Sequence, residues 1–364
     1  MSKSHQHFIP RTYLEKFAVR STDNKYFLSA LNKQTGKLIK EISVKDVCVE
    51  TDLYTLKHLS ENEKYKIEDF FSENIESKYP EIYRLLVKEK KEFISGEERA
   101  LILYTTLSMY FRTPKMLNSF AKFAAELAIK LKTNPETDKI NFVGYQISVK
   151  DKSFDEIRKQ IKEHQRLDHI KTQMAVLHQF VRFKALDGFM VIELIGDQQF
   201  VTSDNPVIMT NAPNVAGGMF NKHNATYIPL DTKHALFIAP GNEGGIINKV
   251  FYVKDSFFQH VTLNHRVYES AERWILGTPE GIGGFLKDKE EYGEPATQDH
   301  PILDIFEKKL QLMLKMVQLM EKGISNENKE LVEFMKELQK NELYKDHAEF
   351  QDTVAKVRAQ GLEI

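Results

Sequence analysis

The stretch GFMVIELIGDQQFVTSDNPV, residues 188–207, decides the fold class of this chain. Upstream of it, apolar residues recur every three or four positions, which predicts helices. These predicted helices cover residues 65–88, 97–132 and 154–185. Within the stretch, residues 189–195 and 199–202 are apolar and rich in β-branched or aromatic side chains, and a Gly196-Asp197 turn separates them. The pattern predicts two strands, so the chain changes from helix to strand near Gly188.

Working outward from this stretch, short apolar runs with Gly-, Asn- and Pro-rich connections predict further strands. They lie at residues 225–229, 235–239 and 250–253, and a helix is expected to follow at 256–270. Near the N-terminus, residues 26–32 and 38–44 flank Gly36, which can take the positive φ of a hairpin loop. We therefore expect an α+β fold, in which a mainly helical body packs on a small antiparallel sheet.

The C-terminal part is predicted to be a helical appendage. Residues 277–299 contain several glycines and are interpreted as a loop, so we divide the chain into an α+β domain, residues 1–285, and an appendage, residues 300–364. An apolar stripe at helical spacing marks the appendage: Ile302, Phe306, Leu310, Met313, Val317 and Met320. Because an isolated helix would leave this stripe in water, we expect it to pack on the body or on a second copy, which would give a homodimer through the C-terminal helices.

Composition excludes several classes of protein. Lysine and arginine total 51 against 52 aspartates and glutamates, so no bulk field draws the chain to nucleic acid or to an anionic membrane, and a basic patch would have to be local. The single cysteine, Cys48, permits no intramolecular disulfide and fits a reducing compartment. No secretory signal and no apolar run of membrane-spanning length are present, so we expect a cytoplasmic protein without a membrane partner.

Known catalytic motifs are absent from the sequence. There is no phosphate-binding loop, no dinucleotide-binding glycine motif and no nucleophile elbow. Arg158 and His164 have the spacing of a helical toxin nuclease motif, but Lys159 stands where a small polar residue is expected, and chance explains the pair better. His5-Gln6-His7 has a metal-site spacing without a preceding strand, and the acidic positions 69, 73 and 76 share a helix face that is more simply a solvated one.

Five short motifs resemble a known family. They are HFIPRTYLEKF at residues 7–17, FRTP at 111–114, FVTSDNPV at 200–207, IPLD at 228–231 and LN at 263–264. In this order they resemble a largely bacterial family of unknown function, domain-of-unknown-function family 4238, over roughly residues 5–275. The resemblance implies candidate positions and no reaction, and it does not extend to the helical appendage.

The chemistry of these positions leaves two interpretations open. Asp204 follows an apolar strand, where it could act as a base or bind a metal, or could simply cap backbone amides in a turn. Arg112 lies in an apolar helical run, where a guanidinium needs an anionic ligand or a buried salt bridge to Asp204 or a glutamate. We expect the N-terminal segment to dock near the Ser-Asp-Asn-Pro turn and to bring His7 close to Asp204.

Two functional hypotheses follow. The first is a hydrolase acting on a phosphate-bearing substrate, a nucleic acid or nucleotide, in stress or phage defence, with or without a divalent metal. Its catalytic residues would be Asp204, Arg112 and His7, and its substrate-binding residues Ser203, Asn205 and Asn264. The second is a non-catalytic binding or interaction protein, in which the same polar residues form a structural network. Burial in a satisfied network would favour the second hypothesis, and a shared open cleft the first.

Overall fold

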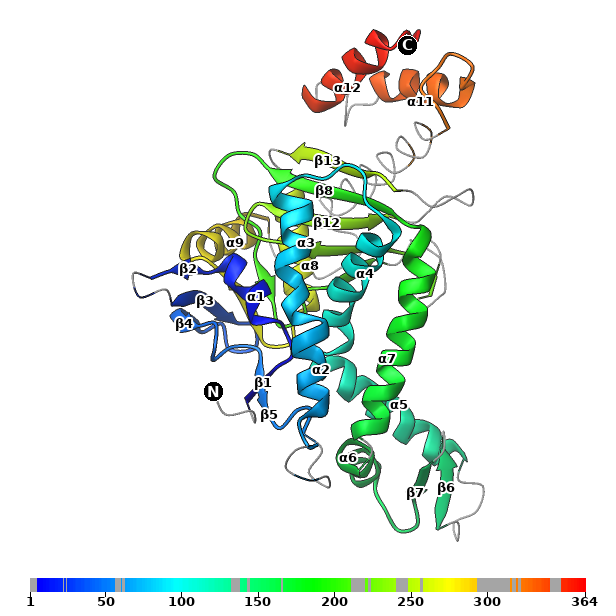
Figure 1. The fold of residues 1–364 in the computed structure, drawn as a ribbon. Helices are drawn as coiled ribbons and strands as arrows, with labels where there is room; N and C mark the ends of the chain where they lie inside the picture. Colours follow the sequence, from blue (N-terminus) through cyan, green and yellow to red (C-terminus); the bar gives the residue numbers. More distant parts are fainter. Residues whose placement is uncertain are drawn as a thin grey trace.

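The computed structural model contains two five-stranded sheets among the residues it describes, with helices on both faces of one of them (Figure 1). The described residues are 5–364 except 22, 24, 56–59, 61–62, 132–137, 143–144, 165, 211–219, 222–223, 240–247, 256–257, 293–314, 316–318, 320–321 and 341–347. Among these residues, no helix has the length and apolar character needed to cross a membrane.

The central sheet has the strand order β10-β11-β12-β8-β13. Its strands are β10 (Ile208–Thr210), β11 (Ala225–Pro229), β12 (His234–Ala239), β8 (Gly188–Leu194) and β13 (Val250–Asp255). Neighbours run antiparallel except β13, which is parallel to β8. Alternate residues of β8 enter two different apolar clusters, Val191 with the helices α4 (Gly96–Phe111) and α7 (Arg166–Phe183), and Ile192 with α8 (Phe258–Ser270). Because both faces are buried, these strands are almost continuously apolar.

The second sheet joins strands from the N-terminal part of the chain to strands that lie more than 150 residues later. It consists of β2 (Val19–Arg20), β3 (Tyr26–Asn32), β4 (Leu38–Ser43), β14 (Trp274–Gly277) and β9 (Thr202–Ser203). β3 and β4 form the predicted hairpin, and Gly36 in its loop has φ +67°. β14 lies between β3 and β9 and is antiparallel to both.

The expected fold class was wrong in its central feature. The β structure is not one small antiparallel sheet under a helical body, because the two sheets have five strands each and one strand pair is parallel. Of the strand predicted at residues 199–202, only Thr202 is in a strand, the two-residue β9, and the four-residue β14 was not predicted. Both strands are too short for a periodic signal, and their partners are distant in sequence.

The helical half corresponds to the predicted helices, with interruptions. It contains α2 (Lys66–Asn74), a 3-10 turn η2 (Glu76–Lys78), α3 (Tyr79–Tyr83), a π-helical turn η3 (Arg84–Lys88), α4, α5 (Pro114–Leu131), α6 (Phe154–His164) and α7. α4 starts with a capping box between Ser95 and Glu98 and ends at Phe111, with Arg112 as its C-cap residue two positions before Pro114. Short elements complete this half: β1 (His5–His7) pairs with β5 (Val49–Thr51), β6 (Lys139–Phe142) pairs with β7 (Tyr145–Ser148), and α1 (Arg11–Leu14) continues into η1 (Glu15–Phe17).

The predicted loop at residues 277–299 is instead largely a helix, α9 (Pro279–Tyr292). Its residues Ile282 and Phe285 are buried in the cluster that also contains Leu263 and Val267 of α8. The burial of these apolar side chains outweighs the low helix propensity of the neighbouring glycines.

The C-terminal helices α11 (Lys329–Lys340) and α12 (Ala348–Ala359) have an apolar cluster of their own. It includes Leu331, Phe334, Met335, Val354 and Val357, and it is separate from the clusters of the two sheets. The predicted stripe from Ile302 to Met320 lies outside the described residues. The appendage as a separate domain and its role in a homodimer therefore stay predictions.

Candidate functional site

Arg112 is held by the N-terminal strand and by a glutamate, as one of the two interpretations of its burial predicted. Its Nη2 donates to Glu76 Oε1 at 2.6 Å and to the backbone oxygen of His7 at 2.8 Å. The guanidinium lies over the ring of Phe71 at 4.2 Å. The His7 side chain points elsewhere, with Nε2 at 3.1 Å from the backbone oxygen of Val44, and its burial lowers the pKa of His7 below 6.5. The structure thus brings His7 and Arg112 together through a backbone atom of His7.

The rest of the N-terminal segment docks beside the Thr-Ser-Asp-Asn-Pro motif. Tyr13 Oη lies 2.6 Å from Thr202 Oγ1, two residues before Asp204, and the rings of Tyr13 and Tyr79 meet edge to face at 5.2 Å. Thr12 Oγ1 donates to the backbone oxygen of Glu76 at 3.1 Å. The N-terminal segment therefore fixes both β9 and the turn that leads into α3.

Asp204 binds the backbone that joins α8 to β14. Its carboxylate accepts hydrogen bonds from the backbone N–H groups of Glu272, Arg273 and Trp274 at 2.9, 2.8 and 3.1 Å. Burial raises the pKa of Asp204, and these N–H groups oppose that rise. An acceptor for three consecutive amides closes the turn in the way that a capping side chain does.

The neighbouring motif residues bind α8. Asn205 Nδ2 donates to the backbone oxygen of Ser270 at 2.9 Å, and Ser270 Oγ donates to the backbone oxygen of Asn205 at 2.8 Å. Ser203 pairs with Ile275 in the sheet, and its Oγ accepts from the backbone N–H of Asn205 at 3.1 Å. These contacts fix the end of α8 against the motif.

Asn264 of α8 binds the segment that precedes the motif. Its Oδ1 accepts from the backbone N–H of Val201 and its Nδ2 donates to the backbone oxygen of Gln199, both at 2.9 Å. The Asn264 amide therefore makes the backbone hydrogen bonds that a neighbouring strand would otherwise make to Gln199 and Val201. All six sequence-predicted site residues are buried and contact backbone groups, while their catalytic or substrate-binding roles stay predictions.

The other candidate residues of the sequence analysis pair with separate partners. Of the acidic positions 69, 73 and 76, Glu76 pairs with Arg112, and Arg158 pairs with Asp155 at 3.3 Å. The side chain of His164 lies outside the described residues. Within the described part of the chain, no three His, Cys, Asp or Glu side chains are grouped as a metal site would require.

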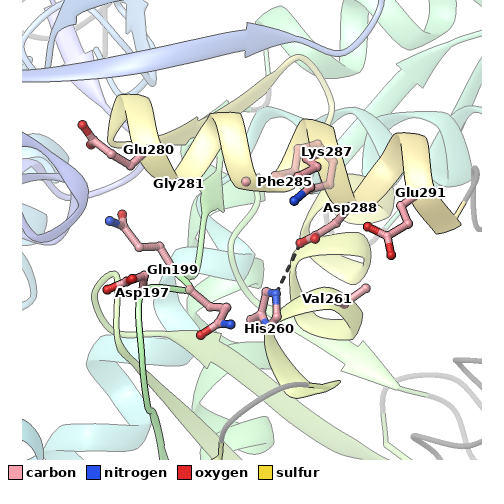
Figure 2. Close-up of a pocket in the computed structure, with 12 residues that line it drawn as sticks. Asp197, Gln199, His260, Val261, Glu280, Gly281, Phe285, Lys287, Asp288 and Glu291 are labelled. Carbon is pink, nitrogen blue, oxygen red and sulfur yellow. Dashed lines mark ion pairs between the residues drawn. The ribbon is translucent and has the colours of Figure 1, made fainter.

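A cavity of about 280 Å³ lies between α8, α9 and the turn that precedes the motif (Figure 2). Its lining residues are mainly polar: Asp197, Gln198, Gln199, His260, Val261, Glu280, Gly281, Gly284, Phe285, Lys287, Asp288 and Glu291. Four of them are carboxylates, and Lys287 is the one lysine in this lining. The cavity is therefore a strongly acidic environment.

A histidine–aspartate pair and a glycine shape this cavity. His260 Nε2 of α8 lies 3.3 Å from Asp288 Oδ2 of α9, and both side chains are largely buried. Thr278 Oγ1 donates to Gln199 Oε1 at 2.6 Å and accepts from the backbone N–H of Gly281 at 3.0 Å. A Cβ atom on Gly281 would approach Gln199 Oε1 to 3.1 Å, so glycine leaves room for that amide.

The motif residues support the walls of the cavity. Asn264 holds the backbone of Gln199, and Asp204 holds the turn before β14, which continues directly into α9. Sequence reasoning missed the cavity because His260 lies in a predicted helix without a recognisable motif and because the segment containing Asp288 was interpreted as a loop. No periodic or motif signal connects the two.

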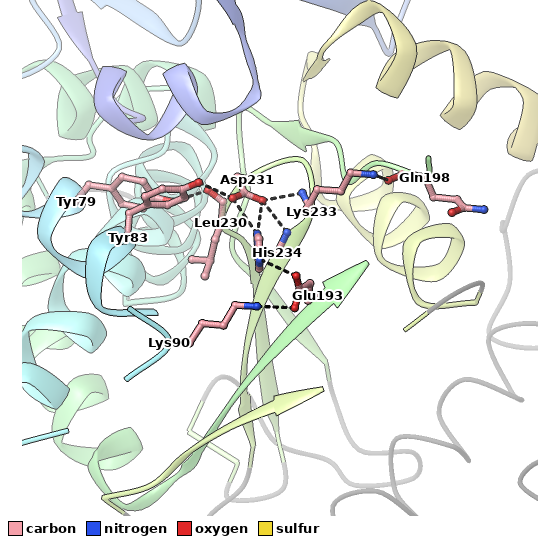
Figure 3. A network of polar contacts seen from close by, with 9 residues as sticks. All are labelled: Tyr79, Tyr83, Lys90, Glu193, Gln198, Leu230, Asp231, Lys233 and His234. Atoms are coloured by element: carbon pink, nitrogen blue, oxygen red, sulfur yellow. Dashed lines mark hydrogen bonds and ion pairs between the residues drawn. The ribbon is translucent and has the colours of Figure 1, made fainter. Parts of the chain in front are cut away.

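A second polar cluster lies at the turn between β11 and β12 and is called here the Asp231–His234 relay (Figure 3). His234 Nδ1 lies 2.9 Å from Asp231 Oδ1, and Tyr83 Oη donates to Asp231 Oδ2 at 2.7 Å. On its other side, His234 Nε2 lies 3.9 Å from Glu193 Oε1, and Lys90 Nζ donates to Glu193 Oε2 at 2.7 Å. The imidazole therefore lies between two carboxylates.

The electrostatics of the relay follow from these contacts. Burial alone would raise the pKa of Asp231, but hydrogen bonds from His234 and Tyr83 outweigh it and leave that pKa below its ordinary value. The bond from Lys90 lowers the pKa of Glu193. Both carboxylates are thus held in the ionised form on either side of the His234 ring.

Comparison with known proteins gives one match. A family model described as a protein of unknown function (DUF4238) matches residues 5–281. The chain belongs to the DUF4238 family. Comparisons with curated proteins and with solved structures each returned no match.

The DUF4238 match covers the two structural networks and only part of the cavity. The contacts of Arg112, Asp204 and Asn264 and the whole Asp231–His234 relay lie within residues 5–281. Asp288 and Glu291 of the cavity lie beyond residue 281. Membership of the DUF4238 family therefore supplies the scaffold of this chain, and it assigns no reaction.

Proposed function

We propose that the chain is a small-molecule-binding protein whose ligand is a compact organic cation, such as an amine, held in the cavity between α8 and α9. The observation that carries this proposal is the lining of that cavity, in which Asp197, Glu280, Asp288 and Glu291 accompany the single lysine Lys287. The volume of about 280 Å³ suits a ligand smaller than a drug-sized molecule.

Electrostatics favour a cation over an anion in this cavity. Opposite charges attract more strongly beside low-dielectric walls than in open water, so grouped carboxylates concentrate cations and repel phosphates. An ammonium group has hydrogen-bond donors and no acceptor, which matches carboxylate and glutamine oxygens such as Gln199 Oε1. The apolar contact needed by a short carbon chain comes from Val261 and Phe285.

The motif geometry supports a binding protein over the hydrolase predicted at those residues. Asp204 already accepts three backbone N–H groups, and Arg112 already binds Glu76 and a backbone oxygen. Groups used in this way hold the scaffold in place, which is the non-catalytic hypothesis for these residues.

Calorimetry with a panel of small molecules tests the proposal. Linear diamines, guanidinium compounds and quaternary amines are titrated beside neutral and carboxylate analogues of the same length. We expect binding by members of the cationic set, and a loss of roughly tenfold or more in affinity for Asp288→Asn and Glu291→Gln, since a charge-assisted bond is removed. Glu290→Gln, an exposed change on the same helix outside the lining, is the matched control. Equal binding by the control and the two cavity variants, or binding of the anionic analogues alone, contradicts the proposal.

The Asp231–His234 relay favours a second candidate, hydrolysis of a phosphate-bearing substrate such as a nucleotide. Lys16 and Lys88 lie over the ring of Tyr83, 4.4 and 5.6 Å from its centre, and Tyr83 binds Asp231. Ammonium groups beside an acid–base histidine suit a phosphate ester.

Incubation with RNA, DNA and nucleotides, with and without divalent metals, tests this second candidate. His234→Gln should abolish any activity found, because Gln keeps much of the size of the imidazole and cannot exchange a proton. Activity that survives His234→Gln, or an inactive wild-type protein in every assay, would rule out hydrolysis through this relay.

A further inference from the structure

A local basic surface lies where the end of α8 meets β3, α5 and α9. Lys33 Nζ donates to the backbone oxygens of Glu269 and Ala271 at 2.9 and 3.0 Å, and Lys115 Nζ donates to that of Ser270 at 3.1 Å. Lys33, which directly follows β3, and Lys115 of α5 therefore meet at the end of α8, a local gathering of cations that the near-neutral net charge of the chain conceals.

Two aromatic side chains alternate with the cations of this surface. Lys33 and Lys289 lie over the ring of Tyr268 at 5.0 and 4.3 Å, and Arg273 lies over the ring of Trp274 at 4.7 Å. Both rings are partly exposed, and the backbone N–H of Lys33 donates to the backbone oxygen of Arg273 at 2.8 Å, which connects the two halves. We call the six residues the basic-aromatic patch: Lys33, Lys115, Tyr268, Arg273, Trp274 and Lys289.

Helix capping accounts for only part of this charge. The C-terminal end of a helix carries roughly half a negative unit charge, whereas the patch gathers four cations. Of the acidic side chains near it, Asp204 accepts from three backbone N–H groups, Glu269 is paired with Arg266 at 3.2 Å, and Glu272 is one residue from Arg273. Partial burial, followed by repulsion from Lys115 and Lys289, lowers the pKa of Lys33 against the opposing attraction of Asp204 and Glu269. Among the described residues, the four cations of the patch therefore outnumber the acidic side chains Asp204, Glu269 and Glu272 beside them, which favours an external anion.

We infer that the basic-aromatic patch is a docking surface for single-stranded nucleic acid. A single strand repeats a phosphate and an unpaired base, and cations beside partly exposed rings match both parts of that repeat. A duplex offers no base faces to Tyr268 and Trp274, and an acidic peptide would use the cations and leave the rings without a role. The inference is independent of the cavity and of its proposed ligand.

Fluorescence anisotropy with labelled single strands of about 12 nucleotides tests the inference. DNA and RNA versions show which of the two kinds of single strand the patch prefers, and a duplex of the same sequence serves as the comparison. We expect the single strand to bind, with an affinity that falls steeply between about 50 and 200 mM salt. The double variant Arg273→Gln, Lys289→Gln should weaken binding roughly tenfold or more and lower the salt slope by about 1.4, since each phosphate contact on a single strand contributes about 0.7.

Tyr268→Leu separates stacking from charge. It keeps an apolar side chain against Phe285, whose ring lies 5.6 Å away, and should weaken binding several-fold at an unchanged salt slope. Lys122→Gln with Lys130→Gln, two exposed lysines of α5, is the matched charge control and should bind as the wild type does. Melting curves confirm that each variant is folded. The inference is overturned if the single strand does not bind at low salt, if the duplex or heparin binds equally well, or if the patch and control variants lose the same affinity.

Discussion

Replacing Asp204 by asparagine should destabilise the protein by about 2–4 kcal/mol. The carboxylate has two bonds at Oδ2, to Arg273 and Trp274, and one at Oδ1, to Glu272. Asparagine offers one oxygen, so one or two backbone N–H groups lose their acceptor and face an amide donor instead. Each hydrogen bond to a charged group contributes about 1.5–3 kcal/mol. Relief from burying a charge, which is what raises the pKa of Asp204, offsets part of that loss.

Equilibrium unfolding in urea measures this change through the midpoint at constant m-value. Asp155→Asn is the control, because its side chain is 79% exposed and its pair with Arg158 is a surface one, so its midpoint should match that of the wild type. The binding and activity assays above are run on folded variant protein. If Asp204→Asn unfolds at the wild-type midpoint while binding or activity disappears, the structural assignment of Asp204 is wrong and the carboxylate acts on a ligand.

Three further predictions concern the scaffold. Arg112→Met should lower the unfolding free energy by about 2–4 kcal/mol in urea titrations. The loss is somewhat smaller than for a fully buried pair because the Glu76 side chain is 18% exposed. A change below about 0.5 kcal/mol would refute a stabilising role for this pair. His7 is held below its ordinary pKa of 6.5, so its contribution to stability is present above pH 6.5 and is lost as the pH falls through the folded-state pKa. His7→Gln, which can still donate to Val44, should therefore lose less stability than the wild type on acidification, and parallel pH profiles would contradict this. Met335→Ala should destabilise the cluster of α11 and α12 by about 2–5 kcal/mol and lower a separate melting transition, whereas a shift of the main transition alone would refute an independent appendage.

Part of the fold follows from local sequence signals. The hairpin around Gly36 and the change from helix to strand at Gly188 are determined by turn chemistry and by apolar periodicity within a few residues, so they were predicted. The parallel pairing of β13 with β8 and the insertion of β14 between β3 and β9 depend on contacts between distant segments. A strand of two residues such as β9 has no period that could set its bounds, so the strand predicted at residues 199–202 overlaps it only at Thr202. The helix α9 was missed for a different reason, since tertiary burial of Phe285 overrides the glycines around it.

The site shows the same division between local and distant information. Motif resemblance located Asp204, Arg112 and Asn264, but the partners that define their roles are backbone atoms brought in by folding, which no residue pattern reveals. The Asp231–His234 relay did have a local signal, an aspartate three residues before a histidine in a turn between two strands. Asp231 accepts from the backbone N–H of His234 at 2.7 Å as well as contacting its ring, so the turn itself sets up the pair.

The DUF4238 match covers the scaffold residues of the chain and only part of the cavity lining. The match covers the residues that hold α8, β9 and β14 in place, whereas Asp288 and Glu291 follow residue 281, where it ends. If the cavity binds a cation as proposed, two of its four carboxylates lie outside the matched segment. Removing both should then weaken the charge preference, which Asp197 and Glu280 still support, and leave the Asp204 and Arg112 networks intact, because neither residue appears among the contacts of those networks. The preference of the cavity for a cation therefore has to be measured for each member of the family. The stability that the Asp204 and Arg112 contacts provide is the property to compare between members.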